Sequence, residues 1–278
     1  MPLTRFVKDR ARARELLAVH ATPAFLDIRS ISATFLTDPA VIAELLPAPL
    51  EPASDPRVSV SVSEIRRSNC VGPFNGASVN IACRYGGEDG LYCLAMPMNA
   101  DTAVIFGREV YAEPKKLADI RLTQDGAHVR GTVTRHGITY IDLLGTFADP
   151  MQEVERESIS RHYYFKYFLA ADGSGLAADP ELVRVTHRGV AHRVARGNVT
   201  ITFRESRHDP VIDLPVLSVE GGAWSESETH TRGEVVTRVP ADQFLPYAFG
   251  KMDDLVEWSD RRPSASRPTS GQTPAAGR

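Results

Sequence analysis

The stretch Val58-Ser59-Val60-Ser61-Val62-Ser63 alternates a branched apolar residue with a small polar one over six positions. Successive side chains of a β-strand point to opposite faces of a sheet, so this alternation predicts a strand with one buried face and one polar face. Valine also favours strands because its branched side chain packs well on a pleated surface. The chain is therefore predicted to build much of its structure from half-buried strands.

The same period-two alternation recurs along most of the chain. Further strands are predicted at residues 78–84, 91–96, 103–106, 128–134, 139–146, 182–194, 199–204 and 234–239. Turn residues separate many of them, namely Gly86-Gly87, Asp125-Gly126, His136-Gly137, Asp172-Gly173 and Arg196-Gly197. An open sheet of this size would leave unpaired edges. The predicted fold class is therefore mainly β (α+β), with an antiparallel sheet that curls or closes.

Helices are predicted at few places. Asp38 before Pro39 is typical of a helix N-cap with proline in the first turn. A second helix is predicted to begin near residue 240 and to continue toward Trp258. Residues 1–20 are predicted to form a helical arm, residues 21–258 a single β-rich domain, and residues 259–278 a disordered tail, since the tail is rich in Ser, Pro and Gly and poor in apolar residues.

Composition excludes several classes of protein. The 278 residues are 42% hydrophobic and 24% charged with a formal net charge of -3, which does not favour a nucleic-acid partner. No apolar run reaches the length of a membrane span or a signal peptide, so we expect a cytoplasmic protein without membrane partners. The spacing of the three cysteines fits no zinc pattern, and His187 and His192 are expected on opposite faces of a strand, so no metal site is predicted.

The most informative segment runs from Gly107-Arg108-Glu109 to Pro114-Lys115-Lys116-Leu117. Pro114 restricts the backbone on both of its sides, so the chain that enters Lys115 has little freedom. Such restriction suits an amine that must be aimed at a substrate. A Pro-Lys-Lys tripeptide is equally typical of a solvated loop.

A lysine amine attacks a ketone only when it is unprotonated, and an ordinary lysine with a pKa of about 10.4 is rarely so near neutral pH. Burial in an apolar pocket and repulsion from Lys116 are the two available means of removing the proton from Lys115. If the two lysines lie on a strand, their side chains point to opposite faces and burial dominates. If they lie in a turn, both effects act.

Gly-Arg-Glu followed at this spacing by Pro-Lys-Lys-Leu resembles the signature of the acetoacetate decarboxylase family. Weaker similarity extends over roughly residues 20–255 and includes 35–51, 163–173 and 209–216. The resemblance implies a closed or cone-like antiparallel β-barrel with a few flanking helices, assembled into a homo-oligomer. It also implies that Lys115 forms an imine with a small oxo acid, that Lys116 helps to keep that amine unprotonated, and that no cofactor or metal is needed.

Further candidate site residues follow from the same comparison. The family's two pocket glutamates correspond to Ser61 and Gly76, and Glu64 is the nearest carboxylate on the first of these strands. Arg29 is the counterpart of an arginine near the substrate carboxylate. Four further residues are expected to bind substrate or to shield the amine from water, namely Tyr111, Glu113, Met96 and Phe106.

Three functions are compatible with these residues. The first choice is decarboxylation of a β-keto acid through an imine at Lys115. The second is an aldolase or dehydratase that uses the same imine on a 2-oxo acid such as pyruvate, as some members with this fold do. The third is a non-catalytic barrel that binds small acids reversibly.

Overall fold

The structure is a computed structural model that describes residues 4–254, so the predicted tail at 259–278 and the end of the predicted helix toward Trp258 lie outside the described residues. Strands dominate it, as the alternation predicts. The long strands are β1 (Ala24–Leu36), β3 (Arg57–Ser68), β4 (Phe74–Tyr85), β5 (Glu88–Met98), β10 (Gln152–Lys166), β11 (Glu181–Phe203) and β12 (Ser218–Arg238). The shorter ones are β2 (Glu51–Pro52), β6 (Lys115–Leu117), β7 (Asp119–Asp125), β8 (His128–Arg135) and β9 (Ile138–Thr146).

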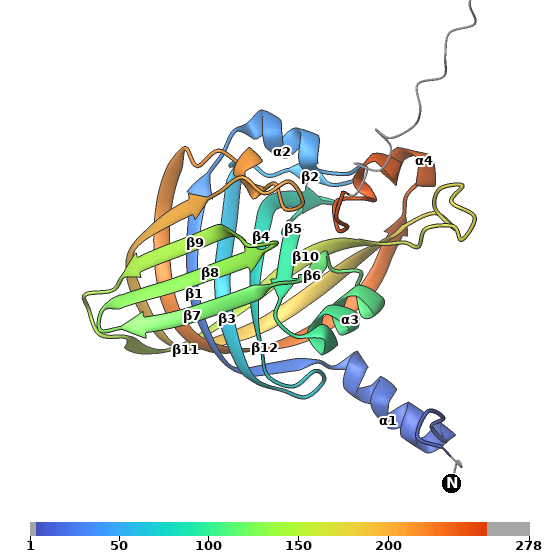
Figure 1. Cartoon of the computed structure of the whole chain (residues 1–278), viewed down its shortest axis with the longest axis horizontal. Coiled ribbons are helices and arrows are strands. Elements are labelled where there is room, and N and C mark those ends of the chain that lie inside the picture. Colours follow the sequence, from blue (N-terminus) through green and yellow to red (C-terminus); the bar gives the residue numbers. More distant parts are fainter. Residues whose placement is uncertain (1–3, 255–278) are drawn as a thin grey trace, which may run out of the picture.

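Seven of these strands pair in a ring. Hydrogen-bonded neighbours lead from β10 through β5, β4, β3, β1, β12 and β11, and β11 pairs with β10 again. Most of the pairings are antiparallel, as predicted, but β5 pairs in parallel with both β6 and β10. Strands β9, β8 and β7 continue from the far end of β11 and lie across β1, β3 and β4 (Figure 1).

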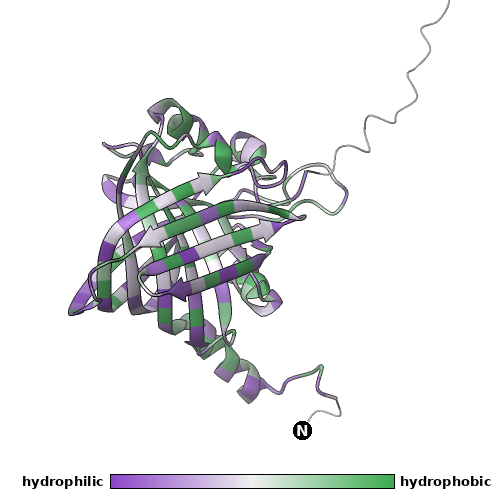
Figure 2. Ribbon diagram, turned by 60° about the vertical axis from the view of Figure 1, so that its left-hand side comes forward, coloured by the Kyte–Doolittle hydropathy of each residue, from purple (hydrophilic) through white to green (hydrophobic). Residues whose placement is uncertain are grey.

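The Val-Ser alternation of β3 separates two environments. Val58, Val60 and Val62 are fully buried in the main core, which also contains apolar residues of β7, β8 and β9. A Cβ placed on Gly131 of β8 would lie 2.6 Å from Cβ of Val62, so the two layers are in direct contact. Each fully buried valine contributes about 1.5–3 kcal/mol of transfer free energy. The serines between the valines face the other side, inside the ring, and Figure 2 shows this alternation of hydropathy along the strands.

Several helices flank the strands, and α1 (Arg10–Ala21) projects away from them (Figure 1). The helices are α1, α2 (Pro39–Leu45), α3 (Asp101–Val110) and α4 (Ala241–Phe244), with two short 3-10 turns, η1 (Val211–Asp213) and η2 (Leu245–Tyr247). The predicted N-cap of α2 is confirmed, because the Asp38 side chain accepts a hydrogen bond from the backbone N–H of Ala40. The helix α1 buries none of its residues. No helix within residues 4–254 is long and apolar enough to span a membrane.

Three predicted elements are wrong. The helix predicted from near residue 240 toward Trp258 ends early: α4 stops at Phe244, η2 at Tyr247, and residues 248–254 are not helical, in a stretch that contains Pro246 and Gly250. Residues 103–106 were expected as a strand but lie in α3, where Ala103, Phe106 and Gly107 are buried at the helical spacing of three and four residues. A short apolar run does not distinguish a strand from a buried helix.

The predicted turn at Arg196-Gly197 is also wrong, because β11 continues through it. The first part of β11 pairs with β10 and β12, and residues 198–203 pair with β9. A Cβ on Gly197 would lie 2.2 Å from the carbonyl oxygen of Thr146. Glycine is present there because two backbones approach closely, not because the chain reverses.

Candidate active site

The segment between α3 and β6 aims Lys115 at the interior. After α3 the chain turns back at Ala112, whose φ of 61° is in the left-handed region. This turn lets the backbone N–H of Glu113 donate to the carbonyl oxygen of Gly107 at 3.1 Å. Pro114 follows, and β6 then pairs in parallel with β5, with Lys115 opposite Met96. The restricted backbone predicted around Pro114 is thus part of a tight connection between a helix and a strand.

Lys115 and Glu113 form a buried ion pair. The distance between Nζ of Lys115 and Oε2 of Glu113 is 2.7 Å, and the two side chains are only 5% and 8% exposed. A buried charge needs a partner because its desolvation is costly. The carboxylate also lies within the distance at which it can accept a proton from the ammonium group.

Gly107 makes room for this pair. A Cβ at position 107 would lie 2.1 Å from Oε2 of Glu113, 2.5 Å from Cδ of Lys115 and 2.6 Å from its Nζ. The glycine of the Gly-Arg-Glu sequence is therefore required for the close approach of both side chains to the backbone of α3.

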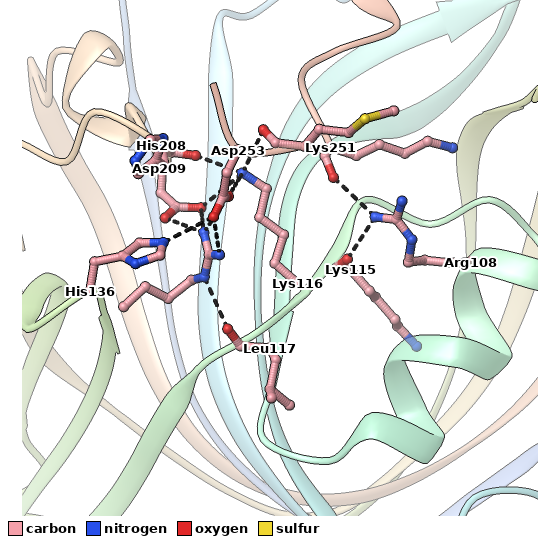
Figure 3. Close-up of polar contacts among 11 residues, drawn as sticks. Arg108, Lys115, Lys116, Leu117, His136, His208, Asp209, Lys251 and Asp253 are labelled. Carbon is pink, nitrogen blue, oxygen red and sulfur yellow. Dashed lines mark hydrogen bonds and ion pairs between the residues drawn. The ribbon is translucent and has the colours of Figure 1, made fainter. Parts of the chain in front are cut away.

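Arg108, the next residue, supports the same segment from the other side. Its guanidinium donates hydrogen bonds to the carbonyl oxygens of Lys115 at 3.1 Å and of Lys251 at 3.0 Å (Figure 3). Arg108 is thus a positioning residue that the motif alone did not explain.

The amine of Lys115 opens onto a cavity of about 460 Å³ inside the ring of strands. Glu113 and Met96 line this cavity, as expected for site residues. Part of the wall is apolar, formed by Phe25, Ile28, Ile65, Phe74 and Met98. Another part carries hydroxyl groups, among them Ser30, Ser61, Ser63, Ser78, Ser225 and Ser227. The volume is typical of a small-molecule site.

Two histidines and a tyrosine also line the cavity, and the sequence did not indicate them. The rings of His162 and His187 are 4.6 Å apart, and Tyr164 lies on the same strand as His162. Burial lowers the pKa of His162 to about 3, and burial together with the charge of Lys115 lowers the pKa of His187 to about 4. Both rings are therefore neutral near pH 7. Nδ1 of His162 and the Tyr164 hydroxyl are buried and have no hydrogen-bond partner among residues 4–254.

Lys116 points away from Lys115 (Figure 3). Because the two lysines are consecutive on β6, their side chains leave opposite faces of the strand. Nζ of Lys116 is 3.3 Å from Asp209, 3.1 Å from Asp253, and within hydrogen-bond distance of the carbonyl oxygens of His208 and Met252. Its charge is thus compensated elsewhere. Of the two arrangements considered for the lysine pair, the structure has the one on a strand, with the two amines on opposite faces.

A network of ion pairs surrounds Lys116. Arg135 contacts Asp209 at 2.6 Å and Asp253 at 2.9 Å, and His136 contacts Asp253 at 2.9 Å. Although burial opposes it, hydrogen bonds from Arg135, His136 and Lys116 hold the pKa of Asp253 well below its usual range. Lys116 therefore has a structural role that joins β6 to the chain near residues 209 and 253.

Four other predicted site residues do not line the cavity of Lys115. Arg29 lies on the outer face of β1, where it donates to Gln124 at 2.7 Å and stacks over Trp224. Glu64 is on the same face of β3 as Val62, which is the face opposite to that of Ser63. Tyr111 and Phe106 are buried and pack against each other beside the helix, with ring centroids 6.1 Å apart. By contrast, Ser61 and Gly76, which the sequence resemblance predicts to replace two glutamates of the family, do line it.

The lysine segment lies within a region that matches a known protein family. The sequence profile of the acetoacetate decarboxylase family matches residues 11–239, which is most of the chain and includes the whole lysine segment. The chain belongs to this family. The resemblance drawn from Gly107 to Leu117 is thereby confirmed.

The proteins that this chain resembles are named for two different activities, an isomerase and a decarboxylase. The chain is 29% identical over 225 residues to a CLA biosynthesis isomerase of Lactiplantibacillus plantarum, covering 74% of this chain and 80% of that one. It is 27% identical over 201 residues to an acetoacetate decarboxylase of Burkholderia lata, covering 70% and 80%. The crystal structure of acetoacetate decarboxylase from Legionella pneumophila has the same fold, with a TM-score of 0.71 and 16% identity over 86% of this chain and 93% of that one.

Proposed function

We propose that this family member is an enzyme that forms a Schiff base between Lys115 and the carbonyl group of a small substrate. The observation that carries the proposal is the placement of the Lys115 amine, which is buried, paired with Glu113 at 2.7 Å and open to a cavity of about 460 Å³. A merely structural ion pair would not need such a cavity at its tip.

The first steps use groups that are already in contact. Glu113 takes a proton from the Lys115 ammonium, and the free amine adds to the carbonyl carbon of the substrate. Loss of water from this adduct leaves an iminium ion with Glu113 as its counter-ion. The iminium accepts the electron pair of a bond broken at the neighbouring carbon, so it promotes either loss of CO2 or loss of a proton there. Protonation of the enamine and hydrolysis of the imine then release the product and restore Lys115.

Decarboxylation of a β-keto acid is one reaction of this kind, and relatives named acetoacetate decarboxylase support it. The second candidate is proton transfer next to the imine, as in an aldolase or dehydratase. The cavity favours the second candidate, since Glu113 and the neutral rings of His162 and His187 supply several proton acceptors. A relative named as an isomerase is in keeping with proton transfer. We further propose that the seven-stranded ring forms the closed, cone-like barrel of the family.

Reduction with cyanoborohydride tests the proposal. Incubation with a methyl ketone and the reductant is expected to add the mass of the reduced ketone to the peptide that contains Lys115, and not in the Lys115→Ala variant. A non-catalytic binding protein would gain no covalent mass at this position. Release of CO2 from acetoacetate then separates the two reactions, because exchange of the methyl protons of acetone for deuterium passes through the same enamine in both.

A further inference from the structure

Serine hydroxyl groups form two rows inside the ring, and together the rows involve four strands, β12, β1, β3 and β4. In the first row Ser225 of β12 is opposite Ser30 of β1, and Ser30 is opposite Ser63 of β3. In the second row Ser61 of β3 is opposite Ser78 of β4. Because the side-chain period of a strand is two, Ser61 and Ser63 are on the same face, and both rows therefore face the cavity.

Some of these hydroxyls pair with each other and others have no protein partner. Ser63 donates to Ser30 at 2.8 Å, and the oxygens of Ser61 and Ser78 are 3.1 Å apart. Within the described part of the chain, the side chains of Ser225 and Ser227 make no hydrogen bond, although both line the cavity. Both serines are half-buried and accessible from the cavity, so a bound molecule can supply their hydrogen-bond partners.

The formal charge around the cavity does not favour an anion. Among the described residues, the charged side chains at the cavity are Lys115, which is positive, and Glu113, which is negative, and none of its lining residues is an arginine. Glu228 points to the other face of β12, where it contacts His192 and His230. The lowered pKa values of His162 and His187 leave both rings uncharged near pH 7. The formal charges of Lys115 and Glu113 sum to zero, and the transfer of a proton from Lys115 to Glu113 does not change this sum. A carboxylate that enters would lose its hydration without gaining a cation other than the reacting lysine.

We propose that the substrate of Lys115 is an uncharged ketone or aldehyde whose remote end carries hydroxyl or carbonyl oxygens, bound by the serine rows through Ser63, Ser30 and Ser225. This inference rests on the proposed Schiff-base function and specifies its substrate class. The adjacent row of Ile28, Ile65 and Phe74, which are opposite one another on β1, β3 and β4, contacts the carbon chain of the same molecule. Of the two reactions considered above, proton transfer at an uncharged carbonyl compound fits this cavity.

A matched pair of probes tests the substrate class. The compounds 5-hydroxy-2-pentanone and levulinate are both five-carbon methyl ketones, and they differ in a terminal hydroxymethyl or carboxylate group. The concentration that gives half-maximal trapping at Lys115 by cyanoborohydride would be measured for each at pH 7.5. Trapping of N-acetyl-lysine methylamide by the same compounds corrects for their intrinsic reactivity. The hydroxyketone is expected to reach half-maximal trapping at a concentration at least tenfold lower than levulinate.

Variants locate the recognition in the serine rows. Ser63→Ala and Ser225→Ala are each expected to raise the half-maximal concentration of the hydroxyketone about threefold to tenfold, the effect of one hydrogen bond. Ser59→Ala is the control, because Ser59 is on the same face of β3 but does not line the cavity.

The outcomes separate the two proposals. Equal or tighter trapping of levulinate at Lys115 overturns the inferred substrate class and leaves the Schiff-base function standing. Equal effects of Ser63→Ala and Ser59→Ala also overturn it. The absence of an adduct at Lys115 with either probe overturns the Schiff-base function, and the inference with it.

Discussion

Glu113 and Lys115 are two residues apart in the chain, and Oε2 of the first lies 2.7 Å from Nζ of the second inside the molecule. Only Pro114 separates them, and the backbone of α3 at Gly107 packs directly against both side chains. A proton acceptor and an amine are thus held together by one short turn, independently of distant parts of the chain.

Glu113→Gln is expected to lower both stability and reactivity. The variant keeps the shape of the side chain but leaves the buried ammonium of Lys115 without its counter-ion, which costs about 3–5 kcal/mol of unfolding free energy. Loss of the proton acceptor slows trapping of a ketone at Lys115 by about 100-fold. Urea denaturation and the rate of adduct formation measure the two effects. Glu64→Gln, on the outer face of β3, serves as the control, and equal trapping rates in the two variants would contradict the role of Glu113.

Gly107→Ala is expected to disrupt the pair without removing a polar group. The added Cβ would lie 2.1 Å from Oε2 of Glu113, so the carboxylate and the amine must both move. Trapping at Lys115 is expected to fall by about 100-fold or more, since displacement by about 1 Å has effects of this size. In Gly221→Ala the new Cβ meets nothing within 4 Å, and its trapping rate should equal that of the parent.

Lys116→Met is expected to reduce stability and to preserve imine formation. Lys116 contacts Asp209 and Asp253, so its removal costs about 1.5–3 kcal/mol of unfolding free energy through lost charged hydrogen bonds. Its amine points away from the cavity of Lys115, so the mass adduct at Lys115 should still form. Loss of the adduct in a variant that remains folded by circular dichroism would show that Lys116 acts on Lys115 after all.

Stability is expected to fall as the pH is lowered from 6.5 toward 4. The pKa of His162 is about 3 and that of His187 about 4 in the folded protein, against about 6.5 when unfolded. In this window the unfolded chain binds more protons than the folded one, so each histidine lowers the unfolding free energy by about 1.4 kcal/mol per pH unit. The contribution of His187 levels off near pH 4 and that of His162 near pH 3, where each folded ring becomes protonated as well.

Urea denaturation at pH 7.5, 6.0 and 5.0 measures this slope. The two histidines contribute about equally to the slope of unfolding free energy against pH. His187→Asn is therefore expected to remove about half of their joint contribution. His192→Asn is the control, because His192 is 50% exposed on the same strand. A slope that is the same in parent and His187→Asn would refute the assignment.

The sequence predicted the elements whose signals are local. The alternation at residues 58–63, the N-cap at Asp38 and the spacing from Gly107 to Leu117 each depend on neighbours in the chain, and each was found as predicted. Residues 103–106 failed because a four-residue apolar run has no clear period. Gly197 failed because its reason for being glycine is the carbonyl oxygen of Thr146, a contact that chain order does not indicate.

The candidate site was predicted only in part for the same reason. Lys115, Glu113 and Met96 were expected there, and all three line the cavity. His162 and His187 were missed because they come from β10 and β11, and no motif links either to the lysine segment. Arg29 and Glu64 were expected at the cavity but do not line it, because their positions on β1 and β3 place both side chains on the outer face.

By itself, then, the sequence determined that the chain is mainly β and that Lys115 is its reactive candidate, because strand period and motif spacing are properties of adjacent residues. Only the tertiary structure decided that Lys115 faces a cavity while Lys116 faces an ion-pair network, and that serines of four strands and two neutral histidines line the same cavity. Those relationships depend on the register between strands far apart in the chain, which local side-chain preferences do not specify.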